Sequence, residues 1–343
     1  MLTTAALDPA PTAGTPAQQL FEAAHGRCLL ISEHEIDLAA TPAAPWIPGL
    51  RRAARGPDAE GTAPAAPVLR YEDAAPPGLS FRGLRATVRI PWEHTDSGAQ
   101  LGYVAAVQLE RDRQRRGYFT LHAASAALGP RGVLLLGKEG AGKTSVLGHL
   151  CRSHGAELIG NDLSVVGGRG PRYEIAAGTR FLFLRQASVD RSMAALGLPR
   201  PERDGLDPWR TKWIVEPEQV SIPVADGPRP LDAAFLVHAD ETQRDLRTGT
   251  AADAATLLHL YENAARYIRG TATHVLHGTA LRPLGYLPSL DTEPLYRRRA
   301  AVIGHLAHEL GIRYVSGPAG AIAEYIARHA SNAESEPTPK APR

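Results

Sequence analysis

Apolar runs separated by polar turns recur along the chain and predict a protein rich in strands. Residues 28–32 form an apolar run, and residues 84–94 and 102–110 alternate between apolar and polar side chains. An arginine-rich turn at 111–117 leads into a further apolar run at 118–128. Because alternation with a period of two is typical of half-buried strands, these runs predict an antiparallel meander.

From residue 132 the pattern changes to that of an α/β domain. The apolar run 133–136 is followed by a glycine-rich turn, a helical stretch at 144–155 and a second apolar run at 156–160, which is a β-loop-α-β unit. Residues 194–230 are rich in Pro, Gly and charge, and we expect an irregular excursion there. Later segments repeat the mixture, with strands predicted at 164–168, 181–185, 231–239 and 312–317 and helices at 257–268, 296–310 and beyond 317.

These patterns suggest two domains and a tail. We expect a β-rich N-terminal domain over residues 1–115, a larger α/β domain over 116–330, and a disordered tail over 331–343. Within the first domain, residues 41–78 are dominated by Pro, Ala, Gly and Arg, so we expect a linker-like insertion there.

Charge and composition narrow the function classes. The 38 Lys and Arg nearly balance the 36 Asp and Glu, so neither nucleic acid nor a membrane is an expected partner. The two cysteines, Cys28 and Cys151, are far apart and indicate neither a disulfide scaffold nor a zinc site. The N-terminal segment lacks the pattern of a signal peptide and no apolar run is long enough to span a membrane, so a cytoplasmic location is expected.

The strongest chemical signal is a phosphate-binding loop. The segment GKEGAGKT matches the pattern G-x-x-x-x-G-K-[ST] at every fixed position, between a predicted strand and a predicted helix. Its glycines let successive backbone N–H groups point at phosphate oxygens, and the N-terminus of the helix adds positive potential. The lysine would reach the β- and γ-phosphates and the threonine hydroxyl would bind Mg²⁺. The predicted nucleotide-binding residues are Gly137, Lys138, Glu139, Gly140, Ala141, Gly142, Lys143, Thr144 and Ser145.

An acidic residue ends the next predicted strand. Asn161 and Asp162 follow the run 156–160, and carboxyl ends of neighbouring strands in an open sheet face the same crevice. Asp162 is therefore a candidate to bind Mg²⁺ together with Thr144, directly or through water, or to accept a proton from an incoming hydroxyl. The alternative is that Asn161 and Asp162 only form a turn or cap a helix.

Residues 121–166, which contain this loop, resemble the catalytic core of the HPr kinase/phosphorylase family and its stand-alone relatives. His122 precedes Lys143 by 21 residues, and a pair of polar residues ends the next strand, as in that family. The resemblance implies an α/β fold with a P-loop kinase core of the HPr kinase/phosphoenolpyruvate carboxykinase type. It also implies ATP and Mg²⁺ as cofactors, transfer to a hydroxyl, a role for His122 near the transferred phosphate, and assembly into a homo-oligomer.

The chain departs from the family at several points. Asn161 stands where the family has the first of two adjacent acids, the later Glu-Arg-Gly signature is missing, and the first 115 residues differ from the N-terminal domain of the type member. The chain is thus expected to be a stand-alone relative and not a true HPr kinase. Because an isolated histidine on a strand is often structural, a purely structural role for His122 stays open.

Two cations in the excursion are candidates for a phosphate clamp. Arg210 and Lys212 lie beside Trp209 and Trp213, and Lys212 is one of only four lysines in the chain. The alternative is that Lys212 is a solvated cation between two packed tryptophans. The arginine runs 111–116 and 297–299 are expected to be exposed.

The predicted function is that of an ATP-dependent phosphotransferase. It would transfer the γ-phosphoryl group to a hydroxyl of a peptide, a protein serine or a small biosynthetic intermediate, with Lys143, Asp162 and His122 as catalytic residues. The alternative, which Asn161 favours, is a regulatory or assembly NTPase that binds nucleotide without phosphotransfer. The acceptor, the choice between ATP and GTP and the oligomeric state stay open at the level of sequence.

Overall fold

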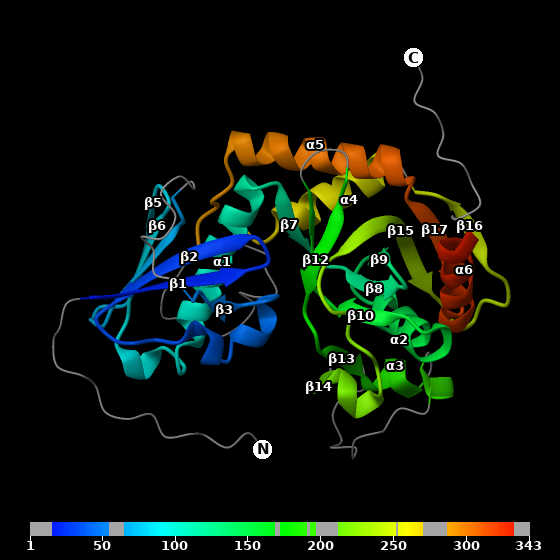
Figure 1. The fold of residues 1–343 in the computed structure, drawn as a ribbon, viewed down its shortest axis with the longest axis horizontal. Helices are drawn as coiled ribbons and strands as arrows, with labels where there is room; N and C mark the ends of the chain where they lie inside the picture. The colour runs from blue at the N-terminus through cyan, green and yellow to red at the C-terminus, as the bar shows by residue number, and fades with distance from the viewer. Residues whose placement is uncertain are drawn as a thin grey trace. The chain divides into compact units, whose positions relative to one another are not determined.

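The protein is a mixed α/β structure whose described part divides into two compact units (Figure 1). The computed structural model describes residues 16–54, 65–168, 172–190, 193–196, 212–251, 253–269 and 287–332. The first unit consists of Met1–Arg113 with Tyr267–Leu290, and the second of Gln114–Arg266 with Asp291–Arg343. The segment that we expected to form one continuous domain, 116–330, is therefore interrupted by a stretch that belongs to the first unit.

The first unit contains a six-stranded sheet in the order β3-β1-β2-β4-β6-β5. Strands β1 and β2 form an antiparallel hairpin, while β2, β4 and β6 pair in parallel. The strands are β1 (Ala17–Ala23), β2 (Gly26–Ser32), β3 (Arg51–Arg52), β4 (Val68–Glu72), β5 (Gly78–Arg82) and β6 (Arg85–Arg89).

Part of the expected linker at 41–78 is ordered core structure. Strand β4 lies inside this range and pairs with strands on both sides, and its Leu69 and Tyr71 are buried. Leu69 and Tyr71 alternate with Arg70 and Glu72, so one face of the strand packs on the core of the unit. Residues 55–64 of the expected insertion lie outside the described residues.

The run 102–110, which we expected to be a strand, is part of helix α1 (Ala99–Arg115). The buried residues Leu101, Val104, Ala105 and Leu109 recur at helical spacing and pack on the sheet of the first unit. Over a run of only nine residues, helical spacing of apolar side chains can be mistaken for alternation with a period of two. The helix forms because only that period puts all four side chains on one face.

The arginines that end α1 are not the exposed face that we expected. Arg111 and Arg113 are buried. The guanidinium of Arg113 donates to Glu110 at 2.6 Å and to the carbonyls of Ala23 and Ala24 at 3.0 and 2.9 Å. Because five N–H donors can satisfy several acceptors at once, a buried arginine here joins the helix to the β1–β2 turn.

The second unit contains a nine-stranded sheet with a parallel centre. The path runs β10-β8-β9-β15-β12-β11-β7, and β17 adds to β15 and carries β16. Strands β9, β15 and β17 pair in parallel, and the other pairs are antiparallel. The strands are β7 (Tyr118–Leu121), β8 (Ala124–Leu128), β9 (Arg131–Leu136), β10 (Glu157–Gly160), β11 (Ser164–Gly167), β12 (Glu174–Gly178), β15 (Arg229–Ala239), β16 (Arg247–Thr250) and β17 (Arg313–Gly317).

Helices cover both faces of this sheet (Figure 1). Helices α2 (Lys143–His154) and α6 (Ala319–Asn332) pack on one face, and α4 (Ala254–Ala265) and α5 (Glu293–Leu310) on the other. In β9, Val133 and Leu135 join the core under α2, whereas Leu134 and Leu136 join the core under α4 and α5. An unbroken apolar run therefore marks a strand that is buried on both sides.

The excursion 194–230 is only partly described. Strands β13 (Leu182–Arg185) and β14 (Lys212–Val215) form a small separate sheet, and helix α3 (Gln186–Asp190) follows β13. Residues 197–211 lie outside the described residues, as do residues 333–343 of the expected tail, while residues 331 and 332 end α6.

Two further expectations concern charged and sulfur-containing side chains. Arg299 in the run 297–299 is almost fully buried and donates to Asp291 at 2.6 Å and to Gln114 at 2.7 Å, so this part of the run is not exposed. Cys28 and Cys151 are both buried, and burial raises the pKa of each thiol to about 12.

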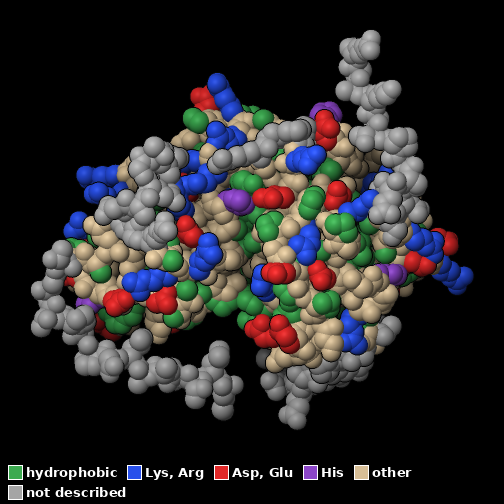
Figure 2. Space-filling model, in the orientation of Figure 1, with side chains coloured by type: hydrophobic (Ala, Val, Ile, Leu, Met, Phe, Trp, Pro, Cys, Tyr) green, Lys and Arg blue, Asp and Glu red, His purple; other side chains and the backbone are tan. Residues whose placement is uncertain are grey.

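The charged side chains of the visible face are interspersed by sign, in keeping with the formal net charge of +2 (Figure 2). Among the helices that the structure describes, none is long and apolar enough to cross a membrane.

Candidate functional site

The glycine-rich loop joins β9 to α2, and its backbone takes conformations that favour glycine. Gly137, Gly140 and Gly142 have φ angles of 147°, 81° and 83°. Gly142 is the N-cap of α2, and Lys143 is the first residue of the helix. The loop is held from outside because Ala239 at the end of β15 donates its N–H to the carbonyl of Ala141 at 2.9 Å.

Gly142 and Gly140 provide a matched test of this geometry. A Cβ at Gly142 would lie 2.3 Å from the Cβ of Ala239, whereas a Cβ at Gly140 would meet nothing within 4 Å. We expect Gly142→Ala to lower the free energy of unfolding by about 3 kcal/mol, from overlap and left-handed strain together. Gly140→Ala should cost only about 1 kcal/mol, from the strain alone. Urea unfolding of both variants measures the difference, and equal losses would contradict this packing of the loop.

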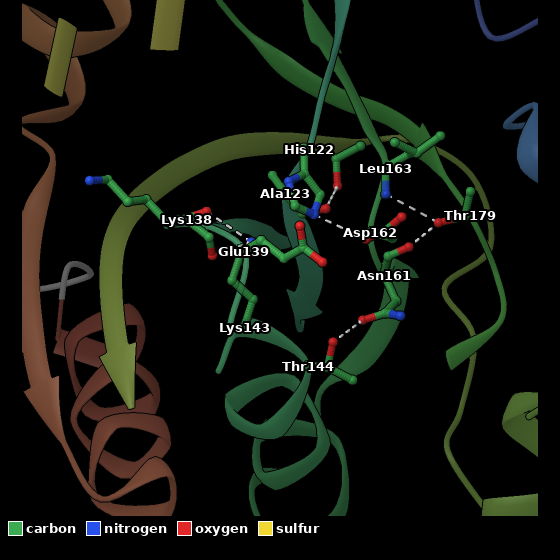
Figure 3. Close-up of polar contacts among 12 residues, drawn as sticks. His122, Ala123, Lys138, Glu139, Lys143, Thr144, Asn161, Asp162, Leu163 and Thr179 are labelled. Carbon is green, nitrogen blue, oxygen red and sulfur yellow. Dashed lines mark hydrogen bonds and ion pairs between the residues drawn. The ribbon is translucent and has the colours of Figure 1, made fainter. Parts of the chain in front are cut away.

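Lys143 is buried and turns back over its own loop (Figure 3). Its ammonium donates to the carbonyls of Gly137 at 2.8 Å and Lys138 at 3.2 Å. An ammonium has three donors and no acceptor, and two of these donors hold the loop. The charge is thereby fixed at the rim of the loop.

Thr144 and Asn161 are joined by a hydrogen bond across the site. The Thr144 hydroxyl donates to Oδ1 of Asn161 at 2.9 Å (Figure 3). Asn161 is fully buried, its Nδ2 donates to the carbonyl of Phe181 at 3.3 Å, and its own carbonyl accepts from the hydroxyl of Thr179. Because the proton of Thr144 points at Asn161, the lone pairs of the hydroxyl remain available to a metal ion.

Asp162 faces His122, one strand away. Nε2 of His122 lies 3.0 Å from Oδ1 of Asp162 (Figure 3). Asp162 has a φ of 76°, a left-handed conformation that aspartate tolerates better than most residues. The backbone of His122 is fixed by Asn263 of α4, whose Oδ1 accepts from the N–H of His122 at 2.8 Å and whose Nδ2 donates to its carbonyl at 3.4 Å. The pair thus lies where the end of β7, the turn between β10 and β11, and helix α4 meet.

The environment of His122 keeps its ring neutral at physiological pH. Burial lowers the pKa of His122 below its usual 6.5, and the charge of Lys143 acts in the same direction, against the hydrogen bond to Asp162. The neutral ring donates one N–H, which Asp162 can accept.

The same shift predicts how stability depends on pH. The unfolded chain protonates His122 near pH 6.5, whereas the folded protein resists protonation down to a lower pH. Stability is therefore complete above about pH 6.5 and is lost as the pH falls toward the folded pKa. We expect His122→Gln to reduce this loss, because glutamine does not titrate. Urea titrations of both proteins between pH 7.5 and 5 measure it, and identical slopes would contradict the assignment.

Other predicted residues lie at the edge of this arrangement. Glu139 in the loop accepts from Arg185 of β13 at 2.6 Å, and Lys138 is exposed, as its variable position suggests. Ser145 is buried in the first turn of α2. For the expected clamp, Lys212 begins β14 and pairs in register with Arg185, while Arg210 lies outside the described residues.

The structure brings together most of the predicted set and adds residues that sequence reasoning missed. His122 and Asp162 are adjacent, Lys143 lies in the loop beside them, and Thr144 meets Asn161. Asn263 and Thr179, which fix His122 and Asn161, carry no motif. Their separation of 141 and 18 residues from their partners explains why no local signal could find them.

The oxygens of the site are of the kind that binds Mg²⁺. Within the described residues, no three His, Cys, Asp or Glu side chains gather as a metal site. Magnesium commonly uses one or two protein oxygens and takes its other ligands from water and phosphate, so a preformed cage is not required. The Thr144 hydroxyl and the partly exposed carboxylate of Asp162 supply oxygens of the right kind.

Comparison with known proteins adds little beyond this geometry. No family model matches the chain, and no curated protein matches it. Among solved structures, the chain is similar to the Hpr(Ser) kinase/phosphatase from Coxiella burnetii, at 10% sequence identity and a TM-score of 0.28. The match covers 63% of this chain and 95% of that chain. The function proposed below is therefore argued from the residues of this site.

Proposed function

We propose that the protein is an ATP-dependent kinase that transfers the γ-phosphoryl group to a hydroxyl of a peptide, a protein serine or a small biosynthetic intermediate. The observation that carries the proposal is the placement of Lys143, at the start of α2, together with the His122–Asp162 pair. A phosphate cradle, a fixed cation and a carboxylate that can take a proton from the nucleophile are parts that recur in phosphoryl-transfer sites.

The glycine-rich loop and the N-terminus of α2 would bind the triphosphate. Backbone N–H groups of residues 138–144 would cradle the phosphates, with the positive end of α2 behind them. Lys143 would place its charge against the β- and γ-phosphates while it keeps its bonds to Gly137 and Lys138. Bound Mg²⁺ would neutralise charge on the phosphates, held by Thr144 and by Asp162 directly or through water.

Asp162 would accept the proton of the attacking hydroxyl. In the proposed reaction an acceptor oxygen attacks the γ-phosphorus, the bond from that phosphorus to ADP breaks, and the hydroxyl proton passes to Asp162. His122 is a positioning residue, because its ring holds one oxygen of Asp162 at 3.0 Å and thereby orients the carboxylate. Asn161 cannot take a proton and is engaged with Thr144 and Phe181, so Asp162 is the acid at this strand end.

The experiment follows labelled phosphate. Wild-type protein and the Lys143→Ala variant are incubated with ATP carrying a labelled γ-phosphate and Mg²⁺ in a host lysate. Label on a discrete peptide, protein or metabolite with wild type only would establish a kinase and identify its acceptor class. Tight nucleotide binding with release of label only to water would overturn the kinase proposal and indicate a nucleotide-gated regulatory protein.

A further inference from the structure

His259 lies on the helix that fixes His122. It belongs to α4, one turn before Asn263, whose side chain binds both the N–H and the carbonyl of His122. Residues four apart share one face of a helix. The ring of His259 is thus on the side of α4 that faces the end of β7, although no motif or spacing in the sequence connects it to the glycine-rich loop.

One ring nitrogen of His259 is enclosed without a partner. Its Nε2 is shielded from water and has no hydrogen-bond partner among the residues that the structure describes. By contrast, Nε2 of His122 pairs with Asp162 and Nε2 of His34 pairs with Asp73. Buried polar atoms are nearly always hydrogen-bonded. A buried nitrogen without a partner therefore indicates a functional role or a place for a bound ligand.

The charges around His259 show what kind of partner fits. Burial lowers the pKa of His259, and the positive charges of Lys143 and Lys138 act in the same direction, with Glu262 of α4 as the opposing acid. The cations of the phosphate-binding loop therefore contribute to the lowered pKa of the His259 ring. An anion bound there would satisfy the nitrogen and be attracted by both lysines.

We propose that His259 is a phosphate-binding residue of this site, whose Nε2–H donates to an oxygen of the terminal phosphoryl group of a nucleoside triphosphate. The inference rests on the proposed function, because it assumes that a triphosphate occupies the loop. The Nε2 atom is shielded, so a covering side chain must move when the anion arrives. Lys138 is exposed and its charge acts on the ring, so an anion bound at Nε2 would also be attracted by this lysine.

The test compares ligands that differ by one phosphate. Binding of AMP-PNP and of ADP, each with Mg²⁺, is measured by calorimetry for wild type, His259→Leu and His259→Gln. We expect His259→Leu to weaken AMP-PNP binding about tenfold and to leave ADP binding within about twofold. His259→Gln should recover most of the affinity, because its amide can donate from nearly the same place as Nε2.

Control measurements separate this role from a structural one. His308→Leu removes an exposed histidine from α5 of the same unit and should leave both affinities unchanged. In wild type, the ¹⁵N resonances of the His259 ring should shift when AMP-PNP is added and remain in place with ADP. This second readout does not depend on how well His259→Leu folds.

The outcomes distinguish the two proposals. If wild type binds neither nucleotide, the proposed function fails and the role of His259 fails with it. If wild type binds AMP-PNP and His259→Leu binds it equally well, only the role of His259 is overturned. Equal weakening for ADP and AMP-PNP would also overturn it, because the contact would then not involve the terminal phosphate.

Discussion

Replacement of Lys143 by alanine is expected to lower phosphotransfer by about a thousandfold or more. Lys143 is the buried cation at the rim of the loop, and its ammonium also ties together the carbonyls of Gly137 and Lys138. The substitution removes the charge that would stabilise the transferring phosphoryl group and leaves two loop carbonyls without their donor. Both effects act against the transition state, and the second also loosens the cradle.

The measurement is the initial rate of label transfer from γ-labelled ATP, with the midpoint of thermal unfolding as a check on folding. Arg328→Ala is the matched control, since it removes an exposed cation from α6 that pairs with Glu324 in the same helix. We expect this control to transfer at the wild-type rate. A Lys143→Ala variant that transfers phosphate normally would show that the glycine-rich loop is not the catalytic phosphate site.

Asp162→Asn is expected to lower transfer by about 10²- to 10⁴-fold, the contribution typical of a general base. Asparagine tolerates the left-handed conformation of residue 162, where φ is 76°, so the backbone should not change. Its Oδ1 can still accept from His122, as the carboxylate oxygen does at 3.0 Å. The substitution therefore removes the proton acceptor and leaves the surrounding hydrogen bonds in place.

The matched experiment moves the acid by one position. In Asn161→Asp/Asp162→Asn the two residues are exchanged, which keeps the charge of the strand end. We expect no recovery of transfer, because residue 161 points at Thr144 and the carbonyl of Phe181, away from His122. Nucleotide binding measured in parallel shows whether the site still fills. Full activity in the exchanged variant would mean that Asp162 does not act as the base.

Local patterns predicted the part of the protein where neighbouring residues decide the structure. The run 133–136, the glycines after it and the helical stretch that follows predicted β9, the loop and α2, and the structure has these elements in place. The loop was predictable because its conformation depends on its own glycines and on a helix that begins at Lys143.

Other elements could not be recognised locally because distant partners determine them. The run 102–110 forms a helix since Leu101, Val104 and Leu109 pack on a sheet built from residues far along the chain. Strand β4 was hidden in a Pro- and Ala-rich segment, and only its pairing with β2 and β6 makes it a strand. The buried arginines Arg113 and Arg299 were read as exposed because their acceptors lie elsewhere in the sequence.

In the candidate site, too, some features follow from the local sequence and others depend on distant contacts. By itself the sequence determined the glycine-rich loop, the cation within it and a polar strand end at 161–162, since a motif of eight residues specifies a local backbone. Only the tertiary structure decided that Asp162 meets His122, that Asn161 meets Thr144, and that α4 brings Asn263 and His259 to the same place. Those contacts depend on how strands pair and on which face of the sheet each helix covers, and a single sequence records neither.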